Sequence, residues 1–316
     1  MNRILDIVIV NWNAGDQLHQ VISSICAQHD ELIGSVVVVD NASIDSSLSR
    51  IEAVAETLPF RLQIVRNDRN RGFGAACNQG AALCSSEFLL FLNPDTRLFA
   101  GSLAKPLEFM RRPGNDQVGI TGVQLIDERG EIARSCSRFP ALSIFLAQAL
   151  GINRIPQLRE LSQAMGEWDH KETRRVDQVI GAFFLVRRSL FDALGGFDER
   201  FFVYFEEVDF ARRALIAGST SHYVAEAQAF HAGGGTSHQV KAHRLFYSLR
   251  SRLLYGFKHF PRWQAWTLAF VTLAVEPLTR TVFSVAAGGN SVVNTWRGYG
   301  MLYRDLPQIL GRTRLP

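Results

Sequence analysis

A short run of large apolar residues, Phe88 to Leu92, most constrains what this chain can fold into. The turn-forming pair Asn93-Pro94 follows it directly. An unbroken run of this length is typical of a central strand that is buried on both faces, as in a parallel sheet. A buried helical turn would also give the run, but the Asn-Pro pair disfavours continuation of a helix. The expected strand therefore delivers Asp95 to its carboxyl end.

Three more apolar runs precede this one, and segments with helical spacing separate them. The expected strands cover residues 5–10, 35–39 and 61–65. Strands that alternate with helices at this pace predict an α/β protein with a mostly parallel, doubly wound sheet and right-handed crossovers. Further along the chain we expect a helix at 97–112, strands at 118–126 and 176–186, a hairpin turn at 127–131 and a basic helix at 239–258.

The composition allows a large core and bears on where the protein works. The 316 residues are 47% hydrophobic and 20% charged, which suits one large domain or one domain with extensions. The four cysteines form no CxxC pair and no metal-site spacing, so we interpret them as reduced thiols in a cytosolic setting. Asp6 interrupts the first apolar stretch, which argues against a signal peptide. We also expect no segment to reach the ~18 apolar residues that a membrane span needs.

The net charge of +4 hides an asymmetry between the two ends of the chain. Residues 238–316 hold eleven lysines or arginines and only two acids, Glu276 and Asp305, so this part has a net charge of +9. The first 237 residues therefore have a net charge of −5. A basic end on an acidic body predicts that the end meets an anionic partner.

Polar side chains stand at the ends of three expected strands, namely Asn11, Asp40 and Asp95. In open α/β sheets ligands bind outside the carboxyl ends of the strands. Asp40 could accept hydrogen bonds from a base or a ribose there, and Asp95 could hold a divalent cation together with phosphate oxygens. The local alternatives are that Asp40 caps the next helix and that Asp95 caps its own turn. Gly72-Phe73-Gly74 lacks a third glycine and follows the wrong strand, which disfavours a nicotinamide dehydrogenase.

Three motifs together resemble a known family. They are Val39 to Ser43, Asn70 to Gly80, and Leu92 to Asp95. Over about residues 5–260 the chain resembles the family 2 glycosyltransferases with the GT-A fold, and within them the bacterial rhamnosyltransferase-like branch. The resemblance implies that Asp40 contacts the nucleoside and that Asn93-Pro94-Asp95 stands where the family has its Asp-x-Asp metal motif. Because this chain has asparagine at the first position, only one carboxylate remains for the metal.

The resemblance also implies which other residues serve the donor. A lone histidine is more often structural than a ligand, but in related transferases a histidine at the place of His231 completes the metal shell. Asp95 and His231 are therefore the predicted ligands of Mg²⁺ or Mn²⁺. The glycines at 233–235 would let the backbone close over phosphate. The predicted nucleotide-sugar site consists of Asn11, Asp40, Arg71, Gly72, Asn78, Asn93 and Asp95.

Three carboxylates, Glu206, Glu207 and Asp209, follow the aromatic-rich stretch from Phe201 to Phe205. Desolvation by such a stretch raises the pKa of a carboxyl group, which suits a general base. The alternative is the first turn of a helix, where the macrodipole favours acids. The resemblance places Glu207 where the family has its catalytic base, usually Asp, so we predict that Glu207 is the catalytic residue.

The acceptor side of the site is predicted from the second half of the chain. Gly181 and Ala182 lie inside the expected strand at 176–186, where glycine often marks the close approach of a ligand, and the family has a similar pair before its acceptor site. Glu206 and Asp209 are assigned to the same side. Asp209 could instead pair with Arg212 or Arg213 as a helix neighbour. Residues 137–173 are interpreted as an acceptor-side insertion.

The C-terminal part contains two uncharged stretches, at 263–275 and 281–296. Each is too short to span a membrane but suits a helix that lies in a membrane interface. The alternative is a pair of helices packed on the catalytic domain or on a second subunit of a homodimer. We therefore predict a GT-A catalytic domain at 1–237, with a nucleotide-sugar half at about 1–125 and an acceptor half at about 126–237, and a helical extension at 238–316.

The sequence as a whole predicts a metal-dependent, inverting glycosyltransferase that uses a nucleotide-diphosphate sugar. By family likeness the donor is dTDP-rhamnose and the acceptor is a lipid-linked or growing surface glycan. The reduced cysteines predict a cytoplasmic protein, and the basic, partly apolar C-terminal part predicts a peripheral place on the inner face of the bacterial membrane. A UDP-sugar donor and a non-catalytic nucleotide-sugar binding protein remain alternatives, because Asn93 and Glu207 depart from the common motifs. Nucleic acid is not an expected partner, since no nucleic-acid motif accompanies the basic charge.

Overall fold

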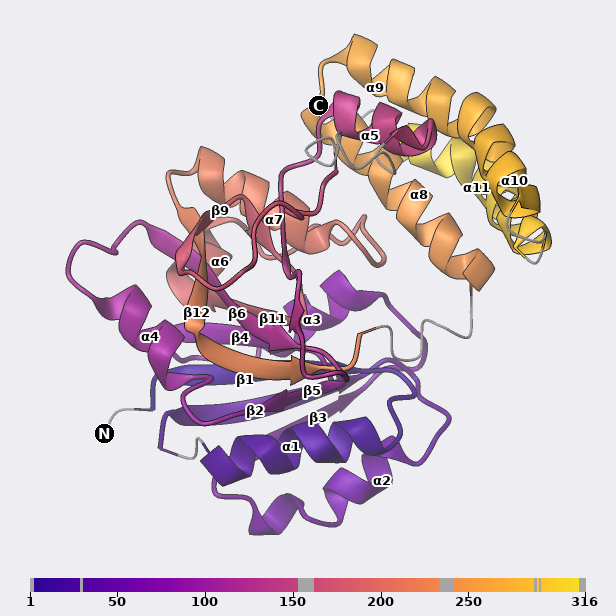
Figure 1. Cartoon of the computed structure of the whole chain (residues 1–316). Coiled ribbons are helices and arrows are strands. Elements are labelled where there is room, and N and C mark those ends of the chain that lie inside the picture. Colours follow the sequence, from indigo (N-terminus) through magenta and orange to yellow (C-terminus); the bar gives the residue numbers. More distant parts are fainter. Residues whose placement is uncertain are drawn as a thin grey trace. The chain divides into compact units, whose positions relative to one another are not determined.

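The structure, a computed structural model, describes residues 3–28, 31–152, 162–233, 241–286, 289 and 291–312. The chain divides into two compact units (Figure 1). The first unit is made of residues 1–138, 169–199 and 206–236, and the second of residues 139–168, 200–205 and 237–316. Two segments from the middle of the chain thus belong with the C-terminal helices, which a single boundary at residue 237 does not describe.

The first unit is built on a sheet whose leading half is parallel. Its strands lie in the order β3-β2-β1-β4, and all three neighbouring pairs are parallel. All four expected strands are therefore confirmed. Their bounds are Leu5–Asn11 for β1, Ile33–Asp40 for β2, Arg61–Arg66 for β3 and Phe88–Leu92 for β4.

Helices cover both faces of this half, as Figure 1 shows for α1 and α3. Ile7 and Val38 belong to the same buried cluster as the apolar residues of α1. On the other face, α3 packs through Gly80, where an added Cβ would lie 2.5 Å from Cγ1 of Val8. Burial on both faces explains why the strands are continuous apolar runs and not alternating ones. The helices of this half are α1 (Asp16–Gln28), α2 (Ser47–Glu52), the 3₁₀ turn η1 (Ala55–Thr57) and α3 (Phe73–Ala81).

The second half of the sheet is mixed. β11 (Phe183–Arg187) runs antiparallel between β4 and β6 (Val118–Ile126), and β12 (Thr220–His231) is parallel to β6. The expected turn at 127–131 is confirmed, since it leads into β7 (Ile132–Ala133), which pairs antiparallel with β6. The remaining elements of this half are β8 (Cys136–Ser137), β9 (Arg174–Val176), β10 (Gln178–Val179), α6 (Arg188–Ala193) and α7 (Glu206–Ile216).

The helix expected at 97–112 begins later than predicted. Residues Thr96–Leu98 form β5, which pairs antiparallel with the end of β12, and the helix α4 covers only Ala104–Arg111. Thr96 and Leu98 are buried by this pairing, so a contact with a distant strand overrides the local helical pattern.

The single strand expected at 176–186 was also wrong. Gln178–Val179 pairs with β8 in a small separate sheet, whereas Phe183–Arg187 joins the large sheet. The chain must turn to change sheets, and Gly181 and Ala182 form that turn. Gly181 therefore lies in a turn and not inside a strand.

The second unit is helical. It contains α5 (Leu142–Ala149), α8 (Lys241–His259), α9 (Arg262–Phe270), the π-helical turn η5 (Val271–Val275), α10 (Glu276–Ala286) and α11 (Val292–Arg312). α9, η5 and α10 form one continuous helix of 25 residues that contains an 18-residue window with a mean hydropathy of 1.4, so it is long and apolar enough to cross a membrane by length and composition. The expectation that no segment reaches this length was therefore wrong. A π-helical turn directly before Pro277 accommodates the proline without ending the helix.

Candidate active site

A buried polar cluster holds the ends of β1 and β2 together. Asn11 Nδ2 donates to Asp40 Oδ1 at 2.7 Å and to Ser47 Oγ at 2.8 Å. The other carboxylate oxygen of Asp40 accepts the Ser43 N–H at 3.0 Å. Both oxygens of Asp40 are thus engaged, and Asn11, which is fully buried, ties two strand ends together. The nucleotide contacts expected of Asn11 and Asp40 stay predictions.

Asn41 joins this cluster to the glycine turn before α3. Its Nδ2 donates to the Gly72 carbonyl at 3.1 Å, and its Oδ1 accepts from Asn67 Nδ2 at 2.9 Å. Gly72 has a φ of +88°, which L side chains rarely adopt, so the turn requires glycine. Arg71 is exposed on the same turn. Asn41 was not among the residues predicted for the nucleotide-sugar site. Its position directly after Asp40 was the one feature of the sequence that pointed to it.

Asn78 fastens α3 to the segment that follows α6. Its Nδ2 donates to the Phe197 carbonyl at 2.8 Å, and its Oδ1 accepts the Phe197 N–H at 2.8 Å. Gly196 lies so close that an added Cβ would be 2.6 Å from Asn78 Oδ1. The amide of Asn78 is therefore engaged with the backbone, and its expected contact with the nucleotide sugar stays a prediction.

Asp95 and His231 lie together at the carboxyl edge of the sheet. β5 and β12 pair with Thr96 opposite His231, which brings the histidine beside Asp95. His231 Nε2 is 3.4 Å from Asp95 Oδ1, and the two side chains are 14% and 9% exposed. The Ala232 N–H also donates to the Asp95 carbonyl at 3.2 Å. The two residues that were predicted as metal ligands are thus neighbours in space, although they are far apart in the chain.

This pair fits two adjacent ligands of one divalent cation. Ligand atoms about 2.1 Å from an octahedral ion and at right angles to each other lie roughly 3 Å apart, close to the observed separation. Among the residues that the structure describes, no group of three or more His, Cys, Asp or Glu side chains could hold a metal. Phosphate and water could supply further ligands to an ion held by Asp95 and His231, as they commonly do for Mg²⁺.

The turn at Gly181 and Ala182 lies beside the same strand end. The Asn93 N–H donates to the Ala182 carbonyl at 3.0 Å, and the Asn93 carbonyl accepts from Thr96 Oγ1 at 2.7 Å. Gly181 has open space around it, because an added Cβ would meet only the Phe73 ring, at 3.7 Å. The predicted acceptor-side pair and the predicted metal motif are therefore adjacent. Their roles stay predictions.

Glu206 and Glu207 open α7, and each has a buried Oε2 with no hydrogen-bond partner among the residues that the structure describes. Burial and the neighbouring charge of Glu207 raise the pKa of Glu206 well above its usual value. Burial also raises the pKa of Glu207. The charge of Glu206 adds to burial in raising the pKa of the Cys77 thiol, so Glu206 lies near α3. Two desolvated carboxyl groups whose charges interact do not readily ionise together, so one of them favours the protonated form while the other can act as a base.

Asp209 is fully buried and forms an ion pair within α7. Arg213 Nε donates to Asp209 Oδ2 at 2.8 Å, and the same guanidinium donates to the carbonyls of Leu194 and Gly196 at 2.8 Å each. The pairing with Arg213 as a helix neighbour is therefore confirmed. It attaches α7 to the segment after α6, whereas a contact of Asp209 with an acceptor stays untested.

The backbone directly before α7 is strained. Tyr204 and Phe205 have φ values of +68° and +72°, a region that costs about 1–2 kcal/mol for each bulky L residue. Strain of this kind concentrates at functional sites. From the sequence these residues were interpreted only as apolar neighbours of the carboxylates. A positive φ cannot be predicted from a sequence that has no glycine or asparagine at the position.

Comparison with known sequences bears on this site. The model of the family described as Glycosyl transferase family 2 matches residues 6–195. The N-acetylglucosaminyl-diphospho-decaprenol L-rhamnosyltransferase of Mycobacterium tuberculosis is 26% identical over 283 residues, which is 85% of this chain and 90% of that protein. Rhamnosyltransferase WbbL of Escherichia coli is 31% identical over 151 residues, which is 46% of this chain and 51% of that protein.

Two solved structures share the fold at low identity. The mannosyltransferase PcManGT from Pyrobaculum calidifontis in complex with GDP-Man and Mn²⁺ has a TM-score of 0.56 and 17% identity, covering 97% of this chain and 86% of that one. GalNAc-T7 with UDP, GalNAc and Mn²⁺ has a TM-score of 0.57 and 17% identity, and the match covers 80% of this chain and 47% of that one. Both are glycosyltransferases with the GT-A fold, so the expected GT-A-type α/β class is confirmed, with a sheet that is mixed in its second half.

Proposed function

Since this chain belongs to glycosyl transferase family 2, we propose that it transfers rhamnose from dTDP-rhamnose to a lipid-linked or growing surface glycan, with inversion at the anomeric carbon. The names of two curated relatives support the sugar, because both are rhamnosyltransferases. The name of the mycobacterial relative supports the acceptor, which in that protein is an N-acetylglucosaminyl-diphospho-lipid. The reaction takes place in the cytoplasm, at the inner face of the bacterial membrane.

The observation on which this proposal depends most is the pairing of Asp95 with His231 at the edge of the sheet. A divalent cation, Mg²⁺ or Mn²⁺, would be held by these two side chains and would neutralise charge on the leaving diphosphate. Asp40, at the end of β2, and the turn at Arg71 and Gly72 hold the nucleoside part of the donor. The Mn²⁺ bound in two glycosyltransferases of the same fold supports a divalent ion.

Glu207 is the base in this proposal. As the acceptor oxygen attacks the anomeric carbon, its proton moves to the Glu207 carboxylate, and the bond from that carbon to the donor diphosphate breaks. Burial and the charge of Glu207 raise the pKa of Glu206 well above its usual value, and burial also raises the pKa of Glu207. In this proposal Glu206 is the group that stays protonated and Glu207 the one that takes the acceptor proton.

The donor site is tested by calorimetric titration of dTDP-rhamnose with and without Mn²⁺. Asp95→Asn should weaken the metal-dependent binding by at least ~100-fold, more than the 10–100-fold that follows loss of an outer-shell group. His231→Ala should weaken it less, because a water can take the place of one neutral ligand. Unchanged metal-dependent binding in the Asp95 variant would place the metal elsewhere.

The donor and the reaction are tested together. A thermal-shift panel of dTDP-rhamnose, UDP-sugars and GDP-mannose identifies the donor, because a specific ligand stabilises the fold by mass action. Release of nucleoside diphosphate with a lipid-linked N-acetylglucosamine diphosphate then measures transfer. Tight donor binding without release, for any acceptor of this class, would instead favour the non-catalytic nucleotide-sugar binding protein.

A further inference from the structure

The continuous helix of α9, η5 and α10 exposes six large apolar side chains along one side and, apart from Leu268 and Pro277, buries small or polar side chains on the other. The buried positions include Ala265, Ala269, Thr272 and Ser284. The large apolar residues on the other side are 54% to 66% exposed. Together with the exposed Ala274 they follow one another every three or four residues and form one stripe along the helix, which we call the outer stripe: Trp263, Trp266, Phe270, Ala274, Leu278, Val282 and Val285.

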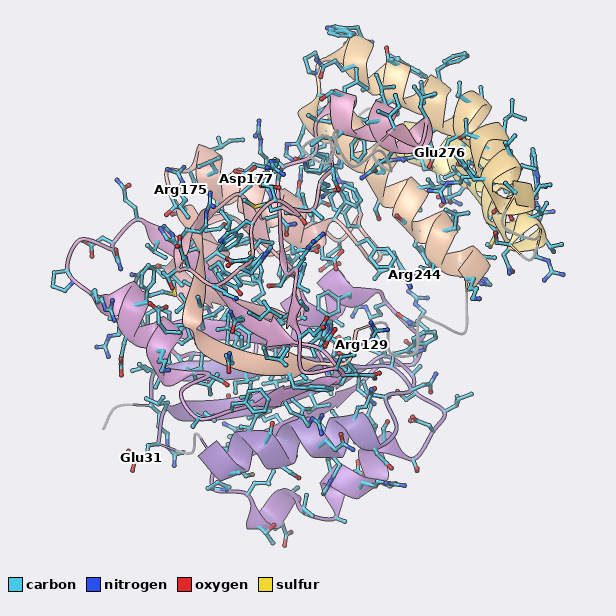
Figure 2. All side chains as sticks on the ribbon, viewed as in Figure 1. Glu31, Arg129, Arg175, Asp177, Arg244 and Glu276 are labelled. Carbon is cyan, nitrogen blue, oxygen red and sulfur yellow. The ribbon has the colours of Figure 1, made fainter. Side chains whose placement is uncertain are left out.

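The charge around the outer stripe is basic. Glu276 is the only acid of this helix and is 1% exposed; Figure 2 labels it. It pairs with Arg252 of α8 and Arg280 of α10. The other acid of the C-terminal part, Asp305, pairs with Arg250 at 2.7 Å. Both acids are therefore neutralised inside the helical unit, and the exposed charges beside the stripe are arginines.

From these observations we propose that the outer stripe is a surface that docks on an anionic lipid bilayer, with the helix lying in the plane of the interface. An exposed apolar face with tryptophans at one end and basic residues beside it is the pattern of an interfacial helix. The stripe is about 33 Å long at 1.5 Å per residue, so it offers an extended apolar contact. The inference names the surface behind the peripheral placement proposed above.

A spanning orientation does not fit the packing of this helix. Its buried face holds the ion pair of Glu276 with Arg252, near the middle of the helix. The neighbouring helices α8 and α11 also hold Arg250 and Asp305. If α9 and α10 crossed the hydrocarbon core, these charged neighbours would be drawn into it, which is costly. In the interface plane only the outer stripe meets the acyl chains.

A second copy of the chain fits the outer stripe less well than a lipid surface does. Two-fold symmetric dimers bring the same patch of each subunit together. A dimer through the outer stripe would therefore bring Arg262 and Arg280 of both copies to one interface, with no exposed acid of this helix to offset them. Anionic headgroups instead provide the opposite charge along the whole edge of the stripe.

Co-sedimentation with vesicles of equal parts phosphatidylcholine and phosphatidylglycerol tests the surface, without any sugar substrate. The triple variant Trp263→Ser, Trp266→Ser, Phe270→Ser should lower the partition coefficient by at least about tenfold, since each large side chain removed from lipid contact is worth up to that factor. The control is Leu83→Ser with Ile216→Ser, which changes two exposed apolar residues of the first unit and should leave partitioning unchanged. Melting curves of both variants show whether they fold.

Depth measurements separate the in-plane from the spanning orientation. Single-tryptophan variants with the one tryptophan at position 263, 270 or 278 are bound to vesicles that contain lipids brominated at different depths. Equal, shallow quenching at all three positions is the expected result, whereas quenching that deepens along the helix would overturn the in-plane proposal. Equal partitioning of the triple variant and the parent, or loss of a dimer in the triple variant with no loss of vesicle binding, would overturn the lipid surface itself. Neither result would affect the proposed transfer reaction.

Discussion

Asp40 and Glu206 are buried to the same extent, 4% exposed each, yet the protein treats their carboxyl groups differently. Both oxygens of Asp40 accept hydrogen bonds, one from Asn11 and one from the Ser43 N–H. Glu206 leaves Oε2 without a partner, and so does its neighbour Glu207. A buried polar atom without a partner costs free energy, so such groups call for an explanation. We infer that hydrogen bonds fix the Asp40 carboxylate in place before a ligand binds, whereas the Glu206–Glu207 pair is completed by the substrate.

The sharpest way to break this comparison is to remove the charge of Glu207. Glu207→Gln should lower kcat by at least the ~10²-fold typical of losing a general base, while donor affinity stays near that of the parent. Because the replacement also removes a charge from a desolvated pair, the melting temperature should not fall. The matched control is Glu207→Asp, which restores the family's usual residue and should retain measurable turnover. Near-normal turnover in Glu207→Gln would move the base to another group.

The second way is to break the buried ion pair of α7, which should affect stability before chemistry. Asp209→Asn leaves the guanidinium of Arg213 without its counter-charge, and we expect a loss of about 2 kcal/mol or more in the free energy of unfolding. Asp192→Asn breaks an ion pair of the same spacing with Arg188, but Asp192 is exposed, so its loss should be at most about 0.5 kcal/mol. Urea unfolding of both variants measures the difference. A folded and stable Asp209→Asn variant without turnover would instead assign Asp209 to the reaction.

Sequence reasoning succeeded where a residue's role depends on its own strand. The continuous apolar runs of β1, β2 and β4 predicted strands buried on both faces, since this pattern follows directly from a sheet covered by helices on two sides. The meeting of Asp95 with His231 came from family likeness, because no local pattern links residues from different strands. Physical reasoning alone could place Asp95 at a strand end but could not find its partner.

The rest depends on contacts between distant segments, which a single sequence does not encode locally. Asn78 looks like a ligand-binding residue in its motif, yet it holds the Phe197 backbone of another segment. Thr96–Leu98 looked helical but pairs with β12. The uncharged stretches at 263–275 and 281–296 looked like two separate helices, but residues Arg262–Ala286 form one continuous helix that passes through Pro277. In each case tertiary packing decided between two locally reasonable outcomes.

The hydrogen bonds that Asp40 accepts provide a further test of this comparison. Asn11→Ala removes the donor to Asp40 and Ser47 in a fully buried place, so the acceptors it leaves behind lose their partner. We expect a loss of about 2 kcal/mol in the free energy of unfolding. The control is Asn115→Ala, which loses one partly buried hydrogen bond to the Phe109 carbonyl and should cost about 1 kcal/mol. An Asn11→Ala variant of parental stability with weaker donor binding would show that Asn11 serves the nucleotide directly.

The smallest expected effect concerns how stability depends on pH. The pKa of Glu206 in the folded protein lies above its usual value of 4.5, because burial and the charge of Glu207 disfavour ionisation. As the pH rises above about 4.5, the unfolded chain therefore releases this proton first, while the folded protein keeps it. The folded state then binds more protons, so the free energy of unfolding falls with rising pH until the folded pKa is passed.

The side chain at position 206 cannot ionise in Glu206→Gln, so the free energy of unfolding of this variant should fall less than that of the parent between about pH 5 and pH 8. Urea unfolding across this range, with the exposed Glu128→Gln as control, measures the two slopes. A parental slope in Glu206→Gln would mean that Glu206 is solvated or paired in the folded protein, and the contrast with Asp40 would then disappear.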